Sequence, residues 1–149
     1  MAKRIATENI INTKLKDYKA EQPLGERKIV STSEKGKTYR IKFDKVKPSA
    51  VYTIDGNILT EGDKCDKLVL IQSDVSQNKW IEVFVELKGK GVSHAVDQLK
   101  ATIDKRWARI VAQSFPRNTG NSVIERARDY FQKKGIDFKR GTITMEEAI

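Results

Sequence analysis

The sequence predicts a single mixed α/β domain in which helices flank a central sheet. The chain has 149 residues, a length at which one domain can bury a substantial core. Along the chain, its apolar residues change from a helical period to a strand period and back again. Prolines occur at three positions, each between two periodic segments: Pro23, Pro48 and Pro116. We therefore expect one domain over residues 1–149.

The first part of the chain is expected to form a helix and then strands. Thr7 can cap a helix that runs to about residue 21, because Ile11, Leu15 and Tyr18 recur at helical spacing. The pattern after this helix predicts a loop at 23–25, strands at 38–43 and 50–54, and a turn at 55–57.

The clearest strands lie in the middle of the chain, at 65–72 and 80–88, with a polar loop between them. Side chains of the second strand alternate with a period of two. One face is expected to carry Ile81, Val83, Val85 and Leu87. The other face is expected to carry Trp80, Glu82, Phe84, Glu86 and Lys88.

Helices and strands alternate in the second half of the chain. Ser93 can cap a helix, and a strand is expected at 107–114. A last helix should begin at about residue 121 and stop at Gly135, because glycine is the usual residue just after a helix. A short strand could follow at 136–145. Strands reached through helical crossovers join a sheet in parallel, so the order predicts a mixed sheet.

Composition narrows the classes of function. Lys and Arg number 29 and Asp and Glu number 20, which gives a formal net charge of +9. An excess of this size favours an anionic partner such as nucleic acid, a membrane surface or a phosphate-rich ligand. The single cysteine, Cys65, excludes an internal disulfide and, with the single histidine, His94, excludes a zinc finger.

The expected location is the cytoplasm. The longest aliphatic run, at 68–71, is far too short to span a bilayer. The first residues lack the apolar stretch of a signal peptide. We therefore expect a soluble protein without a membrane partner.

Three charged residues are expected to meet where the central strands end. Glu86 and Lys88 share a face at the end of one strand, and Asp66 opens the preceding strand. If the two strands pair antiparallel, Asp66 lies beside Glu86. Two carboxylates and the carbonyl of Leu87 then suit Mg²⁺, and Lys88 could orient or deprotonate a bound water. Hydrolysis of a phosphodiester is the chemistry that this set favours.

These residues resemble the PD-(D/E)XK nuclease superfamily, whose members have the restriction-endonuclease-like fold. The pattern is an aspartate that opens one strand, then Glu-x-Lys near the end of the next strand, then a helix that often carries a glutamine. Here the matching residues are Asp66, Glu86, Lys88 and Gln98, and the resemblance covers about residues 9–114. It implies an αβββαβ core with a mixed sheet, and a C-terminal helix and short strand would follow that core. It also implies a DNA endonuclease that uses Mg²⁺, with Mn²⁺ as a substitute.

Two features depart from this pattern. Cys65 replaces the proline that commonly precedes the aspartate. Many members also carry an acidic residue on the first helix, for which Glu8 is the best candidate because it lies near the apolar stripe. Glu21 is a second possibility.

Basic residues of the second half could hold the nucleic acid. Residues 100–140 contain eleven Lys or Arg and four Asp or Glu. Together with residues near the expected site, the predicted contacts are Lys90, His94, Arg106, Arg109 and Arg117, with DNA favoured over RNA. A homodimer is possible, because a domain of this size can read little of a long duplex.

Other interpretations of the same residues stay open. The fold could serve a non-catalytic nucleic-acid-binding module, or an RNA-cleaving toxin or defence effector. Glu86 and Lys88 could form only an exposed ion pair, which contributes less than about 1 kcal/mol. Asp66 could be a turn residue, and Gln98 could be an ordinary polar residue of a helix.

Overall fold

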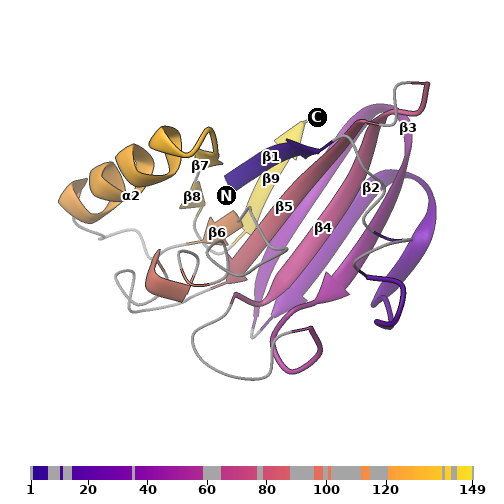
Figure 1. The fold of residues 1–149 in the computed structure, drawn as a ribbon, viewed down its shortest axis with the longest axis horizontal. Coiled ribbons are helices and arrows are strands. Elements are labelled where there is room, and N and C mark those ends of the chain that lie inside the picture. The colour runs from indigo at the N-terminus through magenta and orange to yellow at the C-terminus, as the bar shows by residue number, and fades with distance from the viewer. Residues whose placement is uncertain are drawn as a thin grey trace.

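The fold is built around one strongly curved sheet, with a helix to its side (Figure 1). The computed structural model describes residues 2–6, 11, 15–34, 36–58, 65–76, 79–87, 96–98, 101, 112–114, 121–138, 140–141 and 144–148. The strands are β1 (Ala2–Ala6), β2 (Gln22–Glu34), β3 (Lys37–Thr53), β4 (Lys67–Asp74), β5 (Lys79–Leu87), β6 (Ala112–Ser114), β7 (Asp137–Phe138), β8 (Arg140–Gly141) and β9 (Thr144–Ala148). The helix α2 spans Asn121–Lys133, and residues 96–98 and 101 are also helical.

Four consecutive strands, β2 to β5, form an antiparallel meander. The long strand β3 pairs along one edge with β2, in antiparallel orientation. Along its other edge, the first part of β3 pairs with β9 in parallel and the last part pairs with β4 in antiparallel orientation. The outer edge of β5 is divided in the same way, between β1 in antiparallel and β6 in parallel. The chain therefore closes its meander with strands from both of its ends.

Each face of the sheet packs into its own core. On one face, Val69, Val83 and Val85 pack against Tyr39 and Ile41 of the curled β2–β3 hairpin. A second cluster joins the other face to the helical parts; it includes Leu68, Leu70, Trp80, Phe84, Leu15, Val96, Ala127 and Phe131. Burial in this second cluster raises the pKa of the Tyr52 hydroxyl above its ordinary value.

The expected αβββαβ arrangement with a mixed central sheet is wrong. The described part of the chain is mostly strand, with an antiparallel β2–β5 sheet at its centre and only short helices. Residues 15–18 form a turn, closed by a hydrogen bond from Tyr18 N–H to Leu15 C=O at 3.0 Å, where the first helix was expected. Leu15 is nevertheless buried in the core, so its apolar character reflected tertiary packing and not a helical stripe.

Strand β2 was not predicted either, because its sequence lacks the alternating apolar pattern that is typical of a strand. Pro23 and Gly25 predicted a loop, yet both lie within β2. On this edge strand, Leu24 and Ile29 are exposed and few positions are buried, so the alternating apolar signal is weak.

Several elements were predicted correctly. The two faces of β5 alternate as expected, since Val83, Val85 and Leu87 lie in one core cluster and Trp80 and Phe84 in the other. Helix α2 ends in a Schellman motif, in which Gly135 has φ of 70° and Ile136 N–H donates to Phe131 C=O at 2.9 Å.

None of the helices in the described part of the chain combines the length and apolar character that crossing a membrane requires.

Candidate functional site

The antiparallel pairing of β4 and β5 brings Asp66 against the end of β5, and this pairing confirms the expectation for these two strands. Leu87 N–H donates to Asp66 Oδ2 at 2.8 Å. The backbone of Asp66 is held as well, because its N–H donates to Val85 C=O at 3.0 Å and its C=O accepts from Ile54 N–H at 2.9 Å. The carboxylate of Asp66 therefore has a fixed place beside the Glu86–Leu87 peptide.

Glu86 is a buried carboxylate on the helix-covered face of the sheet. Only 1% of the residue is exposed, and it has the same strand parity as Trp80 and Phe84 of that face. Asp66, half-buried, precedes β4 with the parity of Leu68, which belongs to the same face. Carboxylates are rarely buried without a charge or hydrogen-bond requirement, so a buried acid next to a half-buried one favours a functional site.

The helical residues 96–98 lie over this same face. Val96 is buried in the cluster that contains Phe84 and Leu68, and Gln98 follows it on the same helical segment, half-buried. The structure therefore brings Asp66 and Glu86 together at one end of the sheet, and it places the helical segment that carries Gln98 over the same face.

The remaining expected site residues divide into two groups. Lys88, Glu8, Lys90, His94, Arg106, Arg109 and Arg117 lie outside the described residues. Leu87 is described and is buried, with its N–H directed to Asp66. Further cations of the basic second half lie exposed on or just after α2: Arg126, Arg128, Lys133 and Lys134.

The donors at this site suit a hard cation. Asp66 and Glu86 offer carboxylate oxygens, which Mg²⁺ prefers, and Mg²⁺ is commonly held by one or two carboxylates while it keeps several waters. Within the described ranges, no three residues of the His, Cys, Asp and Glu types gather into a larger ligand set. The described residues therefore fit a site with two carboxylates, and they do not fit a closed structural metal centre.

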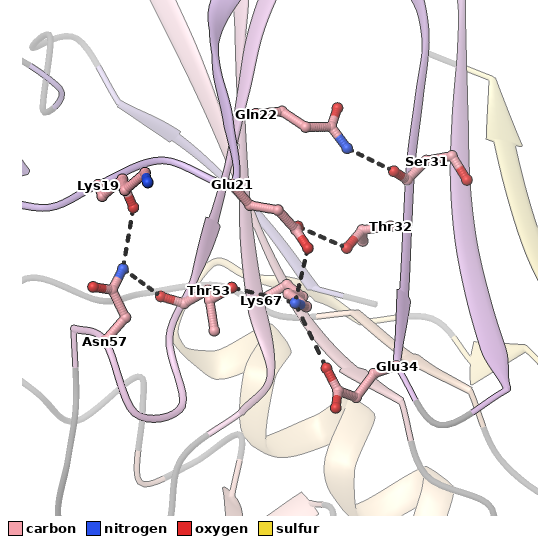
Figure 2. Close-up of polar contacts among 9 residues, drawn as sticks. All are labelled: Lys19, Glu21, Gln22, Ser31, Thr32, Glu34, Thr53, Asn57 and Lys67. Carbon is pink, nitrogen blue, oxygen red and sulfur yellow. Dashed lines mark hydrogen bonds and ion pairs between the residues drawn. The ribbon is translucent and has the colours of Figure 1, made fainter.

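Lys67, which directly follows Asp66 and has the opposite strand parity, holds a half-buried ionic cluster with Glu21 and Glu34 (Figure 2). Its Nζ lies 3.1 Å from Glu21 Oε1 and 3.6 Å from Glu34 Oε2, and it donates to Thr53 Oγ1 at 3.2 Å. Glu21 also accepts a hydrogen bond from Thr32 Oγ1 at 3.3 Å. Glu21, the second possibility for the first-helix acid, is thus engaged on the face away from Glu86.

This cluster closes β2 into an arc. Glu21 precedes β2 and Glu34 ends it, yet both carboxylates meet one ammonium group. Thirteen extended residues would span about 43 Å, so the strand must bend strongly for its two ends to meet. The sequence held one signal for this role, since Lys67 has the parity of the fully buried Val69 and Ile71 and must therefore face a core.

Comparisons of the chain with protein-family models, with curated proteins and with solved structures returned no match. The resemblance to the PD-(D/E)XK superfamily therefore rests on Asp66, the Glu86–Lys88 segment and Gln98.

Proposed function

We propose that this protein is a metal-dependent nuclease that hydrolyses phosphodiester bonds, with DNA as the favoured substrate and the cytoplasm as its location. One observation carries the proposal: the Asp66 carboxylate is fixed by the Leu87 N–H beside the buried Glu86, at the end of two paired strands. The net charge of +9 supports a polyanionic substrate. The proposal concerns the chemistry of this site, and it does not depend on the αβββαβ arrangement.

Each residue has a distinct role in the proposed reaction. Asp66 and Glu86 hold Mg²⁺ or Mn²⁺, which supplies charge neutralisation at phosphate and a more acidic bound water. The Leu87 N–H orients the Asp66 carboxylate, and the buried position of Glu86 strengthens the attraction between a bound cation and its carboxylate. Lys88 assists the attacking water, and Gln98 supports the site from the helical segment.

The decisive experiment compares carboxylate variants with the same shape. Asp66→Asn keeps an oxygen that can accept from Leu87 N–H but loses the charge, and Glu86→Gln does the same at the buried position. We expect each variant to reduce cleavage of a plasmid in Mg²⁺ by roughly two orders of magnitude or more, while the binding of uncleaved duplex changes little. Plasmid nicking on agarose gels and fluorescence anisotropy measure the two quantities.

Asp17→Asn is the matched control, because Asp17 is exposed and lies on no strand. It removes one carboxylate and should leave cleavage unchanged. A wild-type protein that binds duplex but cleaves neither DNA nor RNA with Mg²⁺ or Mn²⁺ would instead support a non-catalytic binding module. Preferential cleavage of RNA would favour an RNA-cleaving effector with the same site.

A further inference from the structure

The bend of the β2–β3 hairpin contains an irregularity in its strand pairing. Arg27 pairs with Lys47 and Ile29 pairs with Lys42, so that one residue of β2 faces the four residues 43–46 of β3. This bulge lies in the middle of the β2 arc, whose two ends are held by Lys67. Bulges bend a sheet and redirect side chains, and they occur frequently near functional surfaces.

Positive charge is concentrated at this bulge. Five cations, here termed the basic corner, lie in the two short segments that form it: Arg27, Lys28, Lys42, Lys45 and Lys47. The same two segments also carry the carboxylates of Glu26 and Asp44. The pKa of the exposed Asp44 carboxyl is lowered by a hydrogen bond from the Lys45 N–H and by the nearby Lys47 ammonium, so this one acid stays ionised among the cations.

Two of these cations lie on facing strand positions. Arg27 and Lys47 are cross-strand partners, and the Lys47 ammonium lies 3.5 Å from Asp44 Oδ1. Arg27 is held in place by main-chain oxygens, because its guanidinium donates to the carbonyls of Pro23 at 2.7 Å, Gly25 at 3.2 Å and Ser49. These carbonyls position the guanidinium without cancelling its formal charge. Arg27 is thus a pre-organised cation of the basic corner.

We propose that the basic corner binds the phosphate backbone of the duplex on which the proposed nuclease site acts. This inference rests on the proposed function and adds a second contact for the same substrate. Strand β3 runs from Lys47 at the corner to Thr53, the cross-strand partner of Lys67, which directly follows Asp66 in the chain. Six residues of strand cover about 20 Å, which corresponds to roughly six base pairs of duplex.

Charge reversal at the two most accessible lysines tests the corner. Lys28 and Lys45 are exposed, so the double variant Lys28→Glu/Lys45→Glu should keep its fold, which circular dichroism and thermal melting can verify. The probe is a fluorescein-labelled duplex in EDTA, without metal, followed by anisotropy at several NaCl concentrations. We expect the Kd to rise by about tenfold or more and the log–log salt slope to fall by about two.

The control is Lys16→Glu/Lys19→Glu, which changes the net charge equally at two exposed lysines away from the bulge. An equal loss of affinity in this control, or an unchanged salt slope in the corner variant, would overturn the proposal. So would a corner that binds vesicles of phosphatidylcholine and phosphatidylserine but not duplex. Because binding is measured without metal, a wild type that binds but never cleaves refutes the nuclease proposal alone.

Discussion

At the scale of single residues, the Lys67 cluster distributes burial unevenly among its charges. The lysine side chain is 6% exposed, whereas the side chains of Glu21 and Glu34 are 37% and 34% exposed. Water can therefore solvate either carboxylate if its partner is lost, but it cannot reach the ammonium group as easily. A buried charge without a counter-charge costs far more than an exposed one.

This asymmetry predicts that removing the two carboxylates lowers the free energy of unfolding more than removing the ammonium group does. Glu21→Gln/Glu34→Gln leaves a buried cation without a carboxylate and should lower the free energy of unfolding by about 2 to 3 kcal/mol. Lys67→Met replaces the ammonium with an apolar group of similar length and should cost about 1 kcal/mol or less. Urea unfolding followed by circular dichroism measures both values, with the exposed Glu26→Gln as a control. A larger cost for Lys67→Met would contradict this account.

The alternation of side chains along the strands made part of the site predictable from the sequence. A period of two fixed which side chains of β5 share a face, and the antiparallel pairing of two adjacent strands then placed Asp66 beside Glu86. The Lys67 cluster and the basic corner could not be predicted in this way. Both depend on the curvature of β2, which arises from a bulge and from contacts between residues far apart in the sequence.

At the scale of elements, the best-predicted helix is the one whose end has a local chemical cause. Gly135 adopts φ of 70°, a conformation that costs little for glycine and more for other residues, and it lets two N–H groups cap α2. Such a signal is contained in a few neighbouring residues. The false helix before Glu21 had only an apolar spacing, which a buried turn residue such as Leu15 satisfies equally well.

Gly135→Ala should therefore destabilise the protein through its backbone alone. A Cβ at this position meets no atom within 4 Å, so the expected cost of about 1 kcal/mol comes from the positive φ. The melting temperature should fall by about 2 to 4 °C in differential scanning calorimetry. Gly25→Ala is the control, since its φ is not positive and its nearest neighbour would lie at 3.7 Å. Equal losses in both variants would reject the backbone explanation.

At the scale of the whole molecule, positive charge is spread over several surfaces. Exposed cations occur on α2 and in the basic corner. The formal net charge of the whole chain is +9. Charge of this kind acts on affinity and on the rate of encounter with a polyanion, and it does not depend on which strands form the fold. The prediction of an anionic partner from composition therefore does not depend on the predicted architecture, which was wrong.

The charge predicts a strong dependence of binding on salt. Each phosphate contact releases counterions, so the association constant for a duplex should fall by a factor on the order of 10³ between 50 and 200 mM NaCl if about six contacts form. Anisotropy titrations of a labelled duplex over this range measure the slope. An affinity that does not change with salt would remove nucleic acid as the partner.

The meander described above also has a kinetic consequence. Strands β2 to β5 each pair with their neighbours in the sequence, so their pairing costs less chain entropy than pairing between distant segments. Strands β1, β6 and β9 join only through pairings between distant segments, including the parallel contact of β9 with β3. We therefore expect the meander to assemble early and to hold the slowest-exchanging amide protons, while the strands from the two chain ends add late and open first. The strand pairing that places Asp66 beside Glu86 would then form in a partly folded chain before the ends have joined the sheet.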